Sequence, residues 1–302
     1  MNMKFYALIL FVATLCLSCK KTEKPIEEEG NEEEVVVDDR ANSLNIMTYN
    51  LYRSGFETDP TSPKSWDFRK GMVIEVLKKY KVDILCGQED DLDQGDDIVE
   101  ALGFAKVGVT KYEGKIDGNG EFNAIYYNPD RFTKKESGYF WLSETPDVPS
   151  QSWDADGKVI CNWALMLDEK TNKEFYIFNT HLDYGGAISR NRSANILKQY
   201  ISDIAGDKPV ILAGDMNCRP DTEPIKTFKS FLNNAFDVSV SAPTGSLGTY
   251  NTFNINYVSK DRIDYVFVTK DIDVFTYHTA PDSKKGYYPS DHFPIICEIS
   301  IQ

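Results

Sequence analysis

Polar and titratable side chains recur in this sequence at points where short apolar runs begin or end. They are Asn50, Glu89, His181, Asp215, Asn217, Asp264, Asp291 and His292. Each alone has an ordinary explanation, such as turn chemistry at Asp215 or a satisfied core position at His181. Strand ends in layered α/β proteins converge on clefts, so residues at equivalent strand ends can meet in space. Their recurrence therefore favours one shared site.

The residue types in this set define the chemistry available to it. Carboxylate oxygens are hard ligands suited to a divalent cation such as Mg²⁺. An imidazole paired with a carboxylate can serve as a base near neutral pH. A zinc enzyme is an alternative, but it needs a cluster of neutral His or Cys ligands. The chain has only 3 His, two of them already in the set, and no Cys spacing typical of zinc.

The elements that must position these residues alternate between strand-like and helix-like segments. Apolar runs predict strands over residues 44–50, 82–87, 123–127, 159–167, 174–181, 209–213, 263–268, 272–279 and 293–301. Apolar residues at helical spacing predict helices over 66–80, 189–205 and 222–232. Strands outnumber helices and many connections resemble hairpins. The sequence therefore predicts mixed sheets packed together with helices outside.

Composition limits the class of protein. A chain of 302 residues with 41% apolar and 13% aromatic residues can build one large domain around a sizeable core. The formal net charge is −14; residues 1–40 hold five basic and nine acidic residues, which leaves −10 for the rest. Such an acidic body lacks the broad basic face that non-specific duplex binding needs. A phosphate-bearing ligand must be held locally, by a metal or a few donors.

The N-terminal segment is predicted to be an export signal followed by a tether. Its apolar run from Phe5 to Leu17 is shorter than the ~20 residues that span a bilayer. It resembles a bacterial lipoprotein signal over 1–19 that ends at a lipidated Cys19, with an ordinary signal peptide as the alternative. This implies an exported protein, periplasmic or at the cell surface, anchored to a bacterial membrane. Residues 20–43 are predicted to be an acidic flexible tether.

Five motifs together resemble the endonuclease/exonuclease/phosphatase superfamily, which includes DNase I-like nucleases, inositol polyphosphate phosphatases and deadenylases. They are Gln88-Glu89, Asn179-Thr180-His181-Leu182-Asp183, Gly214-Asp215-Met216-Asn217, Arg262-Ile263-Asp264-Tyr265 and Ser290-Asp291-His292-Phe293-Pro294. They follow the family's order and make 44–302 the family domain. The resemblance implies an α/β (α+β) four-layer sandwich, with two packed mixed β-sheets flanked by helices, in a secreted, monomeric member.

The resemblance also implies a role for each residue on the metal side of the site. Glu89 is the expected main ligand, Asn50 supports the metal or a phosphate oxygen, and Asp291 lies near the same ion. The expected ion is Mg²⁺, with Mn²⁺ or Ca²⁺ as alternatives, and one metal or two are both open. His292, oriented by Asp264, is the preferred base for the attacking water.

The remaining residues are expected around the phosphate. Asp215 orients the water or assists the leaving group, and it is the alternative base. Asn217 donates to a non-bridging phosphate oxygen, and His181 either donates to the phosphate or protonates the leaving oxygen. Tyr126 and Tyr250 are expected to contact the substrate.

The expected reaction is metal-dependent hydrolysis of a phosphoester, with a phosphodiester preferred. A phosphomonoesterase and a sphingomyelinase-like phospholipase are alternatives on the same scaffold. The substrate class therefore stays open among nucleic acid, nucleotides, sugar phosphates and lipid headgroups. A non-catalytic binding lipoprotein is the alternative from another class, although a binder has little use for the Asp264–His292 pair. Disulfides among Cys86, Cys161, Cys218 and Cys297 are left open, because an oxidising compartment permits them.

Overall fold

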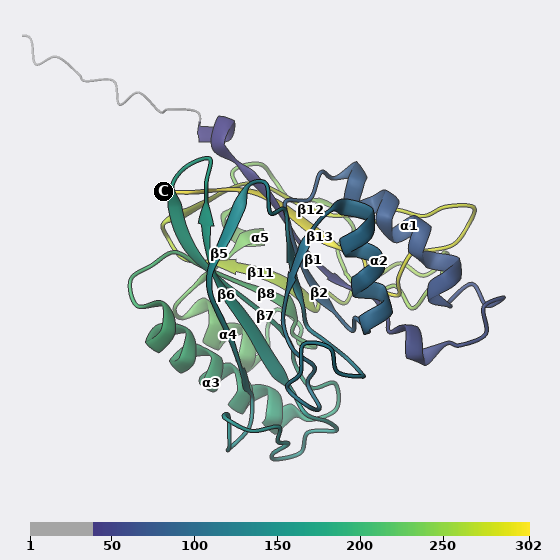
Figure 1. Ribbon diagram of the computed structural model, residues 1–302, viewed down its shortest axis with the longest axis horizontal. Coiled ribbons are helices and arrows are strands. Elements are labelled where there is room, and N and C mark those ends of the chain that lie inside the picture. Colours follow the sequence, from purple (N-terminus) through teal and green to yellow (C-terminus); the bar gives the residue numbers. More distant parts are fainter. Residues whose placement is uncertain (1–38) are drawn as a thin grey trace, which may run out of the picture. The chain divides into compact units, whose positions relative to one another are not determined.

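Two packed β-sheets form the centre of the computed structural model, which describes residues 39–302 (Figure 1). The first sheet has the order β10-β12-β13-β1-β2-β4-β3 and the second the order β5-β6-β7-β8-β11-β9. The first comprises β1 (Leu44–Asn50), β2 (Ile84–Gln88), β3 (Ala105–Val107), β4 (Ile125–Tyr127), β10 (Thr244–Gly245), β12 (Ile272–Thr279) and β13 (Ile295–Ile301). The second comprises β5 (Phe132–Trp141), β6 (Ile160–Asp168), β7 (Lys173–His181), β8 (Val210–Asp215), β9 (Asn233–Asn234) and β11 (Asp264–Val268).

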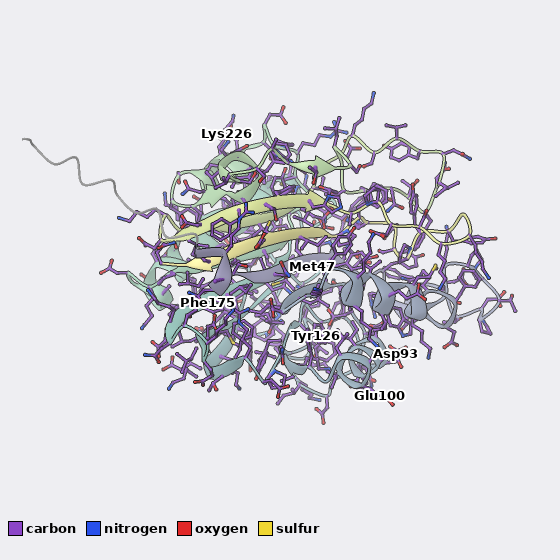
Figure 2. All side chains as sticks on the ribbon, turned by 90° about the horizontal axis from the view of Figure 1, so that it is seen from above. Met47, Asp93, Glu100, Tyr126, Phe175 and Lys226 are labelled. Atoms are coloured by element: carbon purple, nitrogen blue, oxygen red, sulfur yellow. The ribbon has the colours of Figure 1, made fainter. Side chains whose placement is uncertain are left out.

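Helices cover the outer face of each sheet. Helices α1 (Trp66–Lys79) and α2 (Leu92–Leu102) lie on the first sheet, and α3 (Ala187–Ala205) and α4 (Glu223–Lys229) on the second. Figure 2 shows the two outer layers on opposite sides of the sheets, with Glu100 of α2 on one side and Lys226 of α4 on the other. A short helix, α5 (Ala235–Val238), follows β9. The predicted four-layer sandwich is confirmed.

Strand side chains alternate between two apolar environments. Ile46 and Ile177 point into the core between the sheets, whereas their neighbours Met47 and Phe178 pack under the outer helices. Each central strand must therefore be apolar on both faces, which explains the continuous apolar runs in the sequence.

The observed elements match the predicted ones closely, but the sequence pattern missed helix α2, strand β5 and the short elements β3, β9, β10 and α5. Helix α2 opens with the acidic, glycine-containing stretch LDQGDD, which has no clear apolar stripe, and strand β5 is exposed along most of its length. The last predicted helix ends early, at Lys229 instead of Leu232. All four body cysteines, Cys86, Cys161, Cys218 and Cys297, are free and buried, so the open question of disulfides is answered.

The predicted signal over 1–19 and most of the predicted tether lie outside the described residues, although residues 39–42 form a 3₁₀ turn. Within residues 39–302, no helix combines the length and apolar character needed to cross a membrane.

A buried amide pair joins the two sheets at one edge. Gln88, the last residue of β2, donates from Nε2 to Asn179 Oδ1 on β7 (2.8 Å). Asn179 in turn donates to the carbonyls of Gly87 (2.7 Å) and Ala124 (2.9 Å). Because β1–β2 and β7–β8 are parallel pairs, their carboxyl ends lie at this same edge. The link fixes how the residues that follow these strands face one another.

Candidate active site

Strand ends from both sheets bring most of the predicted residues together. On the first sheet, Asn50 ends β1 and Glu89 follows β2. On the second, His181 and Asp215 end β7 and β8 as direct neighbours in register, and Asp264 lies opposite Asp215 at the start of β11. The pair Asp291–His292 enters from the segment before β13.

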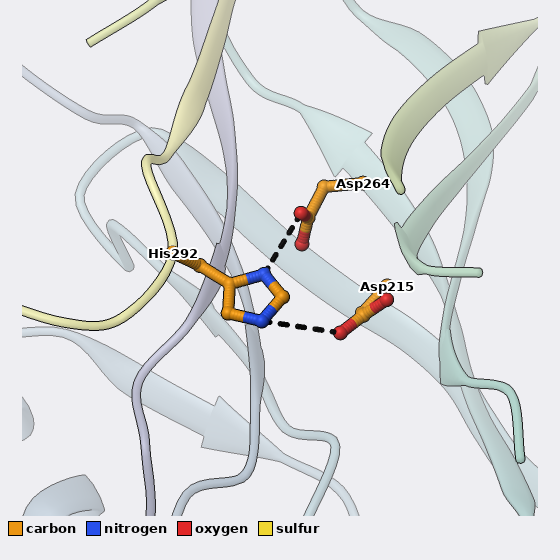
Figure 3. A group of neighbouring side chains, drawn as sticks. All are labelled: Asp215, Asp264 and His292. Atoms are coloured by element: carbon orange, nitrogen blue, oxygen red, sulfur yellow. Dashed lines mark hydrogen bonds and ion pairs between the residues drawn. The ribbon is translucent and has the colours of Figure 1, made fainter. Parts of the chain in front are cut away.

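His292 lies between two carboxylates (Figure 3). Its Nδ1 is 2.9 Å from Asp264 Oδ2, and its Nε2 is 3.7 Å from Asp215 Oδ2. Burial opposes a charged imidazole, but the charges of Asp264 and Asp215 raise the pKa of His292 well above its usual value. The second oxygen of Asp264, Oδ1, is buried without a hydrogen-bond partner, so this carboxylate is directed at the imidazole. The arrangement fixes the ring with Nε2 toward Asp215.

His181 approaches the same carboxylate from the other side, and it has a partner that the sequence did not reveal. Its Nε2 is 3.5 Å from Asp215 Oδ2, and its Nδ1 is 3.5 Å from Oε1 of the buried Glu121. Glu121 is also paired with Lys111 at 2.6 Å. Burial alone would raise the pKa of Glu121, but His181 and Lys111 outweigh it and lower the pKa to about 2.

The charge on His181 is coupled to the orientation of Asn217. Burial disfavours the charged ring, but Asp215, Glu121 and Glu89 together raise the pKa of His181 to about 9. Asn217 Nδ2 donates to the carbonyl of Leu182 (2.8 Å) and lies 2.9 Å from His181 Nε2. Only the neutral ring has a lone pair for that second contact. Protonation of His181 must therefore turn the Asn217 amide toward another acceptor.

Replacement of Glu121 by glutamine should lower the pKa of His181, because it removes one of the carboxylates that favour the imidazolium. In metal-free protein the His181 ring is expected to titrate near pH 9 in the wild type and at a lower pH in Glu121→Gln. Titration of the ring proton signals by NMR measures both values. An unchanged midpoint in the variant would show that Glu121 has no influence on the ring.

The first-sheet side of the site holds the residues predicted to bind a metal. Glu89 has a left-handed backbone (φ 51°), a strained conformation of the kind found at functional sites. Asn50 Nδ2 donates to both Glu89 Oε1 and Asp215 Oδ2 at 3.1 Å, while its Oδ1 accepts from the Tyr52 N–H (3.0 Å). Asn50 thus bridges two acids through its nitrogen, and its carbonyl oxygen is already used to accept from the Tyr52 N–H. This favours support of the site over direct ligation.

A divalent cation fits the carboxylates on this side. Burial, followed by the charges of Glu121 and Asp291, raises the pKa of Glu89 to about 7 against the opposing effect of the two His. A hard cation offsets the mutual repulsion of carboxylates that are crowded together and partly desolvated. Among residues 39–302, the one group of three such side chains whose ligand atoms all lie within 4.8 Å of one another is Asp215, Asp264 and His292. Its imidazole Nδ1 is already bonded to Asp264, so that group fits proton transfer better than metal binding.

The two predicted substrate tyrosines have different positions. Tyr250 is half-buried beside the site, with its ring 5.1 Å from the His292 ring. Tyr126 is fully buried on the face of β4 that packs under the outer helices, and its hydroxyl donates to Asp90. The prediction that Tyr126 contacts substrate does not fit this placement, because the side chain has no exposed surface.

The fold is a layered α/β sandwich in which acidic and imidazole side chains gather where strands of both sheets end. Residues 47–292 match the model of the Endonuclease/Exonuclease/phosphatase family, and the chain belongs to that family. It is 34% identical to the mannosyl-6-phosphatase of Bacteroides thetaiotaomicron, covering 86% of this chain and 100% of that one with a TM-score of 0.80. The resemblance seen in the motifs is thus confirmed.

Two curated relatives extend the comparison. The uncharacterized protein L388 of Acanthamoeba polyphaga mimivirus is 28% identical over 84% of this chain and 98% of its own length. Human nocturnin is 27% identical over 85% of this chain, but the match spans only 65% of nocturnin. Family and relatives together indicate phosphoesterase or nuclease activity.

Proposed function

We propose that this protein hydrolyses phosphomonoesters of sugars with the help of a divalent cation. The observation that carries the proposal is the position of Asp215 between two imidazoles, at 3.5 and 3.7 Å, beside the carboxylates of Glu89 and Asp291. The similarity to a mannosyl-6-phosphatase over that chain's whole length supports a sugar phosphate. The sequence alone had favoured a phosphodiester. The acidic body remains unsuited to long nucleic acid.

A phosphomonoester dianion needs concentrated positive charge, and the two imidazoles supply part of it. His292 and His181 both have raised pKa values and can donate to non-bridging oxygens. A divalent cation at Glu89 would offset further charge as it builds on the phosphoryl group. Asn217 can donate its amide N–H to the same oxygens once its contact with His181 Nε2 is broken.

Asp215 is the better candidate for the base that accepts the proton of the attacking water. The sequence left Asp215 and His292 open and preferred His292. The charges of Asp264 and Asp215 raise the pKa of His292 and so favour its imidazolium form, which is a proton donor, whereas the carboxylate of Asp215 is a proton acceptor. Burial and the charge of Asp264 raise the pKa of Asp215, which makes it a stronger base than an exposed carboxylate. His292, held in place by Asp264, then serves as a donor to the phosphate, and protonated His181 supplies the proton that the leaving sugar oxygen takes up.

A substrate panel tests the proposal. The full-length protein is incubated with hexose 6-phosphates, inositol phosphates, sphingomyelin, short RNA, supercoiled DNA and bis(p-nitrophenyl) phosphate, with Mg²⁺ or with EDTA. Phosphate release from a hexose 6-phosphate that stops with EDTA is the expected result, and Asp215→Asn prepared in parallel excludes a contaminating phosphatase. Cleavage of diesters alone would contradict the monoester assignment, and no turnover on any substrate would favour the binding role.

We also propose, from the N-terminal sequence, that the protein is exported and lipid-anchored through Cys19. Mass spectrometry of the mature protein should find an N-terminus at Cys19 carrying acyl chains. An unmodified N-terminus at another residue would contradict the anchor.

A further inference from the structure

Arg69 on α1 is a buried cation without an acidic partner. Its side chain has 0% exposure, and among residues 39–302 no carboxylate forms an ion pair with it. Burial lowers its pKa to about 10, which still leaves it charged at neutral pH. A buried charge costs stability unless strong hydrogen bonds compensate it. The positions of its hydrogen-bond partners are therefore informative.

The guanidinium donates only to backbone carbonyls. Nη1 reaches Leu51 (2.9 Å) and Pro289 (2.6 Å), Nη2 reaches Tyr52 (2.7 Å), and Nε reaches Lys64 (2.7 Å). This uses the planar, multi-donor geometry that distinguishes arginine from lysine. One side chain thus ties the segments at residues 51–52 and 64 to the segment at Pro289, which is far away in the sequence.

Two of these segments carry predicted metal-side residues. Leu51 and Tyr52 directly follow Asn50, and Pro289 lies two residues before Asp291. A second contact joins the same segments, since Ser290 Oγ donates to the carbonyl of Asn50 at 2.7 Å. Arg69 therefore sets the spacing between the end of β1 and the segment that enters β13.

Aromatic rings enclose the guanidinium and restrict its movement. The rings of Tyr52, Phe253 and Trp66 have centroids 5.4, 5.5 and 5.6 Å from its central carbon. Contact with aromatic faces offsets part of the cost of burying the charge. The Asp291 segment is also held by a further contact, because the Asp291 carbonyl accepts from the backbone N–H groups of Asn251 (2.6 Å) and Thr252 (3.2 Å).

We infer that Arg69 is a positioning residue for the divalent-cation site, which it serves by holding the segments of Asn50 and Asp291 at a fixed distance. This inference rests on the cation-dependent function proposed above. A role of Arg69 through its charge alone predicts the opposite change in cation binding, so the two roles can be told apart by experiment. If Arg69 acted mainly through its charge, its removal would strengthen cation binding by removing repulsion. If it acts by position, its removal weakens binding.

Direct Mn²⁺ binding to the full-length, substrate-free protein tests this, with free Mn²⁺ followed by electron paramagnetic resonance below the melting temperature. Arg69→Met is expected to weaken binding about 10–100-fold, as for other partners of metal ligands. Arg69→Lys keeps the charge but loses the planar, multi-donor geometry of the guanidinium, so this variant should also bind Mn²⁺ more weakly. The control is Lys70→Met, which removes a half-exposed cation from the same helix (side-chain exposure 44%) and should leave binding unchanged.

The outcomes separate this inference from the proposed function. Weakened binding in both Arg69 variants, with a higher Mg²⁺ requirement but retained kcat at saturating Mg²⁺, supports it. Unchanged or tighter binding would overturn it, as would a wild-type protein that binds no Mn²⁺. If Arg69→Met fails to fold, Arg69→Lys and Ser290→Ala, which removes the neighbouring contact, carry the test. Wild-type binding without turnover of any phosphoester would contradict only the proposed function.

Discussion

Replacement of His292 by alanine is expected to lower kcat by about 10²–10⁴-fold, the usual contribution of a positioned proton donor or acceptor. Asp264 holds the ring at 2.9 Å with its Nε2 toward Asp215, so the variant loses the proposed donor to the phosphate on this side of Asp215. The fold should persist, because the ring lies at the edge of the sheets and outside their apolar clusters. Loss of the pairing leaves Asp264 buried without a donor, which costs about 1–3 kcal/mol of stability.

The matched control is His278→Ala, which removes the third histidine of the chain. His278 lies on β12 and contacts Thr244 and Tyr80, away from the catalytic groups. It should keep wild-type kcat. Steady-state kinetics with a hexose 6-phosphate, together with thermal melting of each variant, makes the comparison. Wild-type turnover by a folded His292→Ala protein would remove His292 from the mechanism.

Asp215→Asn separates the two candidate bases. If Asp215 accepts the water proton, its amide variant loses activity at every pH, because an amide cannot accept that proton. If His292 is the base, Asp215→Asn should retain part of the activity and lower the pKa of His292, since one of the raising carboxylates is gone. The pH profile of kcat/KM in the variant distinguishes these results.

The sequence predicted the fold and the central cluster because both follow from local patterns. Continuous apolar runs are required where strands are buried on both faces, and polar residues such as Glu89 and Asp215 stand where those runs stop. Glu121 escaped notice because it precedes the short strand β4 instead of following a long one. Yet β4 is antiparallel to β2, so its beginning lies at the same edge as the end of β2. The same reasoning that singled out Asp291 before its strand applied to Glu121.

Other features depend on contacts that no local pattern contains. Arg69 sits on an amphipathic helix where an arginine normally reaches solvent, and only the tertiary structure places it under three aromatic rings. Tyr126 does not fit the predicted contact with substrate because its side chain is buried, and this too depends on the tertiary structure. A strand residue can point to either face of a sheet, and the face is set by register, which the apolar run IYY around it does not reveal.

Glu89→Gln is expected to remove cation-dependent turnover while stabilising the metal-free protein. The amide keeps the size of the side chain and an oxygen that can accept from Asn50, but it lacks the charge that a hard cation requires. The charge stabilisation that a bound metal supplies is worth several kcal/mol, so the loss of kcat/KM should exceed about 100-fold. EDTA should have no further effect on the variant's residual rate.

The stability change has a defined pH dependence. Burial and neighbouring carboxylates raise the pKa of Glu89 from 4.5 to about 7 in the folded protein. Above pH 7 the folded state therefore carries an unfavourable charge that the unfolded state does not feel, and below pH 4.5 neither state carries it. Without metal, Glu89→Gln should melt at a higher temperature than the wild type at pH 8, with the difference shrinking toward pH 4.5.

Glu100→Gln, on the exposed face of α2 (Figure 2), is the control and should melt like the wild type at both pH values. If Glu89 served only the fold, removal of its charge would have the opposite effect. Glu89→Gln would then melt at a lower temperature than the wild type at pH 8. Gain of stability together with loss of turnover is the pattern of a side chain kept for chemistry at the expense of the fold. Melting curves in EDTA at the two pH values therefore decide whether Glu89 serves a cation or only the structure.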